Sequence, residues 1–332
     1  MNVRLVASAV VVLLLSHYAS GQQMPLGVNE TGKPTQADTN SAEAFKQTLM
    51  RRIVLEEAAV RRAESAHATN VELSKSYMRL GLSYSDAAQW DRAEAVMERS
   101  VFLLRHASGA VGDLATAITQ LASLHLLMRK FRDSEREEQE ALRLREGVGD
   151  QLQIARSWSE LAMFYLAKQK YEKARDFARQ AEAEFVTNGR ASALDRITAQ
   201  FTLSEAVCAL KECPSVIPLL KAALDEAKAA LHPDDFPLGL GTYLLGYAYW
   251  KSGDMSEAED YLKQGMAQMN VQLGWGHPAY LRALRCYAQF LHENKQVEAA
   301  NVVERRIRQA EALVNVHSIQ TAQGIFGANG LR

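Results

Sequence analysis

Several kinds of residue are scarce in this chain of 332 residues, and each scarcity narrows its possible structure or function. The three cysteines, Cys208, Cys213 and Cys286, are too few for the disulfide framework of a small secreted domain. Seven prolines and 19 glycines are also few for this length, as expected where helix-forming residues fill helix positions. With 38 basic against 39 acidic residues, the chain has no net charge to attract nucleic acid or an anionic membrane, so neither is expected as a partner.

Sequence patterns of catalysis and of metal binding are missing as well. No two histidines stand at the helical spacing that binds zinc, and no nucleophile motif occurs. Gly239, Gly241 and Gly246 lack the spacing of a phosphate-binding loop and follow no predicted strand. We therefore expect no enzyme activity, no catalytic residue, no cofactor and no metal.

Long hydrophobic runs are absent except at the N-terminus. Arg4 precedes an apolar run from Leu5 to Leu15, and Ala19, Ser20 and Gly21 supply small residues for a cleavage site. This pattern predicts a secretory signal peptide at residues 1–21, because a membrane-spanning helix needs about 20 apolar residues. The protein is expected to be exported, to a periplasm or outside the cell, with no integral membrane segment after signal removal.

Two terminal stretches show no periodicity. Residues 22–41 are polar and hold two prolines, which predicts a disordered linker. Asn40 and Glu43 have the spacing of a capping box, so an N-terminal capping helix is expected within residues 42–69. Residues 313–332 are expected to form a flexible C-terminal tail.

Helix-forming residues dominate the region between these ends, and the region repeats itself. Six windows align on one small residue, with steps of 41, 40, 42, 42 and 42 residues, at Gly81, Ala122, Ala162, Ser204, Gly246 and Ala288. Leucine precedes the first five of these anchors and tyrosine the sixth, and a short turn follows each. A second small residue stands 19 positions after the first five anchors, from Ser100 to Gly265. Because residues three and four apart share a helix face, each window predicts two amphipathic helices packed through small residues.

The windows resemble the tetratricopeptide repeat family. The third carries Trp158, Leu161, Ala162, Tyr165, Tyr171, Ala174 and Ala181 in the places of the family signature. The step of 40 to 42 residues and the sequence from Leu273 to Pro278 look like the longer kinesin-light-chain variant. The resemblance implies an all-α fold, a right-handed superhelical solenoid of antiparallel helix pairs, with six pairs over residues 70–312.

The resemblance also implies a function and a site. In the family, the first helices line a concave groove that binds a peptide, so we expect a non-enzymatic protein-protein interaction scaffold. Carried over by position, the expected groove residues are Lys75, Arg156, Tyr243, Tyr247, Trp250, Arg282, Arg285 and Gln289. Aromatic and arginine side chains dominate interface energies, and arginine pairs well with carboxylates, so the expected partner is a protein or peptide with an acidic side chain or C-terminal carboxylate.

Three alternatives stay open at this point. Tyr243 and Tyr247 could pack against neighbouring helices, with the arginines as ordinary solvated charges. The chain could instead be a structural component of a cell-envelope complex, acting through its outer surface or its ends. Cys208 and Cys213 could form a disulfide, although two buried thiols at a helix turn are the favoured interpretation.

Overall fold

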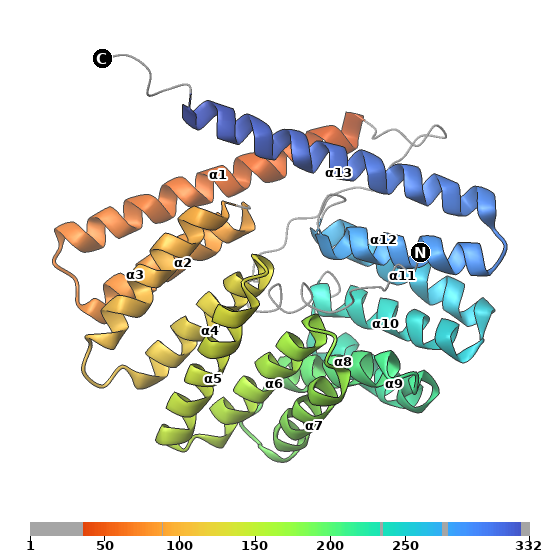
Figure 1. The fold of residues 1–332 in the computed structure, drawn as a ribbon, viewed down its shortest axis with the longest axis horizontal. Coiled ribbons are helices and arrows are strands. Elements are labelled where there is room, and N and C mark those ends of the chain that lie inside the picture. The colour runs from red at the N-terminus through yellow and green to blue at the C-terminus, as the bar shows by residue number, and fades with distance from the viewer. Residues whose placement is uncertain (1–35, 88, 233–234, 274–277, 327–332) are drawn as a thin grey trace. The chain divides into compact units, whose positions relative to one another are not determined.

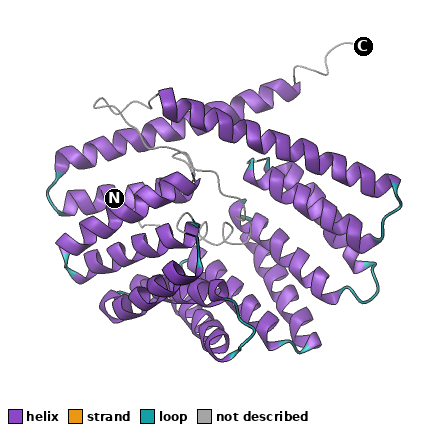
Figure 2. Cartoon of the chain, turned by 180° about the vertical axis from the view of Figure 1, so that it is seen from behind, coloured by secondary structure: helices purple, strands orange, loops and turns teal. Residues whose placement is uncertain are grey.

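The computed structural model describes residues 36–87, 89–232, 235–273 and 278–326, and their side chains from 47 to 311 except at 236, 272, 273 and 278. These residues form thirteen α-helices and no strand (Figures 1 and 2). Their bounds are α1 Gln36–Ser65, α2 Asn70–Asp86, α3 Trp90–Arg105, α4 Val111–Leu127, α5 Phe131–Val148, α6 Gln151–Ala167, α7 Tyr171–Thr187, α8 Ala193–Ala209, α9 Cys213–Ala230, α10 Phe236–Ser252, α11 Met255–Leu273, α12 Pro278–Glu293 and α13 Val297–Phe326.

The helices divide into two compact units. The first comprises residues 42–231, with most of α1 and then α2 to α9, and the second begins at His232 and contains α10 to α13. Within the first unit, each helix packs against the next from α2 to α9. Within the second unit, α10 packs against α11 and α12 against α13. The all-α class and the TPR-like solenoid of helix pairs are confirmed.

The turn inside each pair has the same geometry from repeat to repeat. The residue seven positions after the anchor has a positive φ in every pair where that residue is described: Arg129 (60°), Gln169 (56°), Lys211 (70°), Gly253 (91°) and Lys295 (60°). The following amide donates back to the carbonyl of the residue five before it, as from Lys170 to Tyr165 at 2.9 Å. This left-handed cap ends the first helix and reverses the chain.

Small residues allow the two helices of a pair to approach closely, as their spacing predicts. Ala122, Ala162 and Ala141 are fully buried within the first unit. In the second unit, a Cβ atom built on Gly265 would lie 2.4 Å from the backbone nitrogen of Tyr243. Glycine is required there because α10 and α11 meet backbone to backbone.

The terminal predictions need correction where the structure describes them. Helix α1 begins at Gln36, so residues 36–41 of the expected linker are helical and Asn40 lies inside the helix. No proline occurs within α1, residues 36–65, so nothing interrupts the helix at Asn40. Helix α13 continues to Phe326 through residues 313–326 of the expected tail, where no proline or glycine occurs before Gly324. The expected signal peptide at residues 1–21 and residues 22–35 of the expected linker lie outside the described residues.

The cysteine alternatives are also resolved. Cys208, in the last turn of α8, and Cys213, at the start of α9, form a disulfide with Cα atoms 4.1 Å apart. The favoured expectation of two free thiols was wrong, because the left-handed turn at Lys211 brings the two ends together. Cys286 is a buried free thiol.

Candidate functional site: the inner face of the helix pairs and a polar pocket

Trp250 was expected to line a groove, but the structure places it in the core of the second unit. Its side chain is 2% exposed and packs edge to face against Phe290. The indole Nε1 donates to Glu293 at 2.9 Å, and the Lys251 Nζ lies 3.2 Å from the ring centroid. With its face covered and its donor satisfied, Trp250 is a packing residue, which corrects that part of the groove prediction.

The other expected residues of the second unit are engaged by neighbouring groups. Tyr243 is half-buried, and burial, together with its contact to Cys286, raises its pKa well above the usual range. Arg285 forms an ion pair with Glu311. Gln289 donates to Glu293 at 2.9 Å.

The remaining two residues of this set are half-buried. They are Tyr247, whose ring meets that of Trp250 edge to face, and Arg282. The alternative of packing residues and surface charges describes much of this constellation better than a ligand groove does.

In the first unit, the two expected residues form equivalent ion pairs between successive repeats. Lys75 on α2 lies 3.6 Å from Asp113 on α4, and Arg156 on α6 binds Asp195 on α8 through two hydrogen bonds of 3.0 Å. Each basic residue stands six positions before its anchor, and each partner stands nine before the next anchor. The structure thus ties the first helices of repeats one and two, and of repeats three and four, at the same place.

The Arg156–Asp195 pair is the stronger of the two. Asp195 is also the N3 residue of a capping box with Ser192. Burial alone would raise the pKa of Asp195, but hydrogen bonds from Arg156 and Ser192 outweigh it and lower that pKa. A bidentate arginine–carboxylate pair of this kind fixes the register of two helices.

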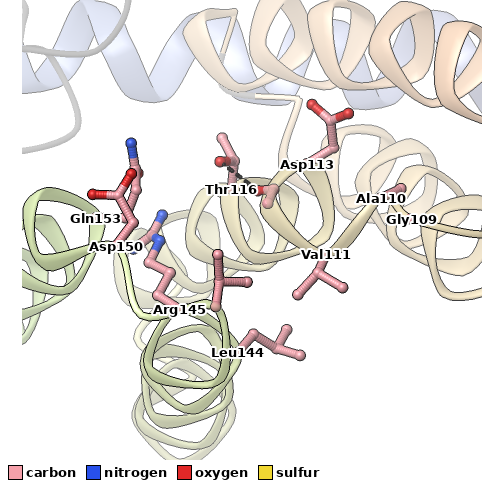
Figure 3. Close-up of a pocket in the computed structure, with 11 residues that line it drawn as sticks. Gly109, Ala110, Val111, Asp113, Thr116, Leu144, Arg145, Asp150 and Gln153 are labelled. Atoms are coloured by element: carbon pink, nitrogen blue, oxygen red, sulfur yellow. Dashed lines mark hydrogen bonds between the residues drawn. The ribbon is translucent and has the colours of Figure 1, made fainter.

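The step between repeats two and three lacks this pair. The equivalent positions hold Thr116 on α4 and Gln153 on α6, both uncharged, and here the structure opens a pocket of about 440 Å³ (Figure 3). It is lined by residues 109–113 and by Thr116, Leu144, Arg145, Val148, Asp150 and Gln153. Three successive helices, α4, α5 and α6, therefore contribute polar and apolar side chains to one cavity.

Arg145 is the most unusual side chain of this pocket. It lies in the last turn of α5 and is only 7% exposed. Its Nη1 nevertheless donates a hydrogen bond of 2.6 Å to the hydroxyl of Ser157 and not to a carboxylate. In Figure 3 its guanidinium lies beside Asp150 and Gln153. Burial lowers its pKa from the usual value, which still leaves an arginine charged.

Two carboxyl groups, the buried Glu138 and the half-buried Glu160, interact electrostatically with Arg145. Glu138 on α5 is 3% exposed, and its Oε2 has no hydrogen-bond partner. Burial, reinforced by the nearby Glu160, raises the pKa of Glu138 well above its usual range. Burial likewise raises the pKa of Glu160 on α6 to about 7. Both carboxyl groups interact electrostatically with Arg145 and favour its charged form, but neither accepts its hydrogen bond to Ser157.

The two acidic residues that line the pocket already have cationic partners. Asp113 pairs with Lys75. Asp150 caps α6 by accepting from the Leu152 amide at 3.1 Å, and it accepts from Arg190 at 2.9 Å. Arg145 is the most buried charged group of the pocket, and its hydrogen bond goes to a neutral hydroxyl.

Our sequence analysis missed this pocket, although the repeat register contains a signal for it. The position of Glu138 is occupied by Met97, Ala178, Leu220 and Leu262 in repeats one, three, four and five, and that of Arg145 by Leu104, Phe185, Ala227 and Met269, all buried. The sixth repeat has Glu304 and Glu311 at these two positions, and both side chains are partly exposed. The second repeat differs from these because its charged residues are buried at both positions. An alignment of the second helices shows charge at these positions in α5 and α13, and burial in the structure distinguishes α5.

Two further observations limit the chemistry of the described residues. No group of three or more histidine, cysteine, aspartate or glutamate side chains among them is placed to bind a metal ion. None of the helices in the described ranges is both long enough and apolar enough to cross a membrane.

Comparison with known proteins identifies the repeat. Residues 155–183 and 243–267 match the model described as "Tetratricopeptide repeat". They fall in the third and fifth windows, where the sequence pattern is strongest, and the family prediction is confirmed. No match is found among curated proteins.

Three solved structures are similar in fold. BtubC (BKLC) from P. vanneervenii shares 19% identity over 66% of this chain and 90% of its own, with a TM-score of 0.56. The apo form of RapI shares 13% identity over 84% and 97%, with a TM-score of 0.63. The Rap conjugation gene regulator of plasmid pLS20, solved with the Phr* peptide, shares 14% over 88% and 74%, with a TM-score of 0.64. At these identities the likeness shows the fold alone.

Proposed function

Because this chain is a tetratricopeptide-repeat protein, we propose that it is an exported, non-enzymatic scaffold that binds a peptide segment of another protein. Repeats of this kind stack into extended surfaces, and no single repeat forms its binding surface alone. A protein of the same fold, the Rap regulator of plasmid pLS20, is solved in complex with a peptide. Peptide binding is the function that this architecture supports best.

The pocket between α4, α5 and α6 is the observation that carries the proposal. It lies where the ion pair between successive first helices is missing, and its lining includes a buried arginine and uncharged hydrogen-bonding groups. Concave sites with a few convergent polar groups are typical of ligand binding. The inner faces further along are less accessible, since Met163, Leu166 and Ser159 are buried.

Panning a phage-displayed library of random peptides against the purified protein tests the proposal. We expect enriched peptides that bind the folded protein in fluorescence anisotropy and lose binding when it is unfolded. Failure of the folded protein to enrich any peptide above a blank support would contradict the proposed function. Light scattering across a range of protein concentrations separates the alternative, because a structural assembly component would self-associate.

Export is tested separately. Residues 1–40 joined to alkaline phosphatase, which folds to an active enzyme only after export from a bacterial cytoplasm, should give active enzyme. The matched control replaces two leucines of the apolar run with arginine. Equal activity of both fusions would contradict export through this segment.

A further inference from the structure

The second repeat carries buried charged residues where repeats one, three, four and five are apolar. Glu138 and Arg145 stand on the buried face of α5 at positions where other second helices contribute core residues such as Met97 and Phe185. Burying a charge without full compensation is costly. A protein that needed only stable stacking would have an apolar residue at both positions.

The position of Arg145 shows what would compensate it. Its described hydrogen bond goes to the neutral hydroxyl of Ser157, and it also lines the pocket of about 440 Å³. The acidic groups that share the pocket are already bound, Asp113 by Lys75 and Asp150 by Arg190. Glu138 and Glu160 also lie near Arg145, and burial raises the pKa of both; the Oε2 atom of Glu138 has no hydrogen-bond partner.

We propose that the pocket formed by α4, α5 and α6 receives a carboxylate of the bound peptide, with Arg145 as the side chain that pairs with it. The guanidinium matches a planar carboxylate, and a charge-assisted hydrogen bond gains strength in a site shielded from water. Gln153 and Thr116 stand at the same pocket and supply further polar groups. The inference rests on the proposed peptide binding and moves its carboxylate contact from Arg282 and Arg285 to the first unit.

The remaining lining of the pocket suits a short apolar neighbour of that carboxylate. Leu144, Val148 and Val111 form one side of it, and Val111 and Val148 are exposed despite being apolar. Such residues gain by covering an apolar side chain of a ligand. The expected ligand therefore has a carboxylate next to a small hydrophobic residue.

Three pools of random octapeptides without aspartate distinguish the source of the carboxylate. The first has a free C-terminal carboxylate and no glutamate, the second has a C-terminal amide and one glutamate, and the third has a C-terminal amide and no acid. We expect at least one acidic pool to bind the wild-type protein at least tenfold more tightly than the neutral pool. Excess propionate should displace the bound acidic pool, whereas the same concentration of propionamide should not.

Two kinds of variant place the contact. Arg145→Gln should remove the preference for the acidic pool, while Arg179→Gln, at an exposed arginine of α7, should keep it. Arg145→Gln could also weaken folding, so Gly112→Phe provides a second test. A Cβ atom at position 112 meets no atom within 4 Å, and the phenylalanine ring would fill the cavity while Arg145 stays intact. Gly112→Ala is its matched control and should bind like the wild type.

The outcomes separate this inference from the proposed function. Equal binding of the acidic and neutral pools would overturn the carboxylate site and leave peptide binding standing. Preserved acid preference in Gly112→Phe would also overturn it. Binding of no pool at all would contradict both.

Discussion

Replacing Gly265 with alanine should destabilise the second unit, although alanine is the better helix former. A Cβ atom at this position would lie 2.4 Å from the Tyr243 nitrogen, 2.7 Å from its Cα and 2.8 Å from its Cβ. These atoms belong to the backbone of α10 or are fixed to it, so no side-chain rotation relieves the clash. Helices α10 and α11 would have to move apart.

The magnitude follows from two opposing effects. Overpacking of this kind costs about 1 to 3 kcal/mol, and replacing a helical glycine with alanine returns about 1 kcal/mol. The net loss should be on the order of 1 kcal/mol, and more if α10 cannot shift. Gly81→Ala should cost less, because the nearest atom there is the Cγ of the flexible Met97 side chain, at 2.5 Å.

Denaturant unfolding followed by circular dichroism and tryptophan fluorescence measures this loss. Trp250 is buried in α10 and reports on the affected unit. The matched control is Gly147→Ala in α5, where an added Cβ meets nothing within 4 Å, and it should stabilise the protein by about 0.5 to 1 kcal/mol. If Gly265→Ala proved as stable as Gly147→Ala, the argument for backbone contact between α10 and α11 would be refuted.

Three further predictions follow from buried charges, turns and the core. Burial raises the pKa of Glu160 from 4.5 to about 7, so the contribution of this group to the free energy of unfolding is complete below pH 4.5 and is lost as the pH rises to 7. Glu160→Gln should therefore flatten the decline in the free energy of unfolding between pH 5 and 8, by at most about 3 kcal/mol. An unchanged pH profile in urea unfolding would contradict this. Gln169 has a φ of 56°, so Gln169→Gly should raise the melting temperature, with a gain of up to about 1 kcal/mol, whereas Gln169→Ala should give no such gain. Trp250→Phe should cost about 1 to 3 kcal/mol, because the smaller ring leaves a cavity in the buried site that Trp250 fills. It should leave peptide binding unchanged, and a loss of affinity in the folded variant would restore Trp250 to the binding site.

The repeat itself was predictable from the chain because it rests on local spacing. Small residues such as Ala122 and Ala162 recur at one place in each pair, and a helix can approach another closely only where side chains are small. The positive φ at Arg129, Gln169 and Lys211 was less visible, because glycine, which usually marks a left-handed turn, is absent from these positions. Their equivalence emerges only when the turns are compared in space.

The binding residues were harder to predict because position on a helix does not specify which neighbour covers it. Trp250 and Leu166 stand at the same place relative to their anchors, the place expected to face a groove, and both are buried. Arg156 and Lys75 were expected to face the groove, and in the structure each pairs with a carboxylate of the next repeat. Long-range contacts of this kind depend on residues about 40 positions away, as the 39 positions between Arg156 and Asp195 illustrate.

The sequence by itself determined the helices, their pairing and the family, since periodicity and small-residue spacing act within a single repeat. The tertiary structure alone decided that Trp250 belongs to the core, that Cys208 and Cys213 are joined, and that a pocket opens where Thr116 and Gln153 replace an ion pair. It also placed the charge of Arg145 against that pocket. The physical reason is that burial and charge compensation are properties of neighbours in space, which successive repeats bring together only after they stack.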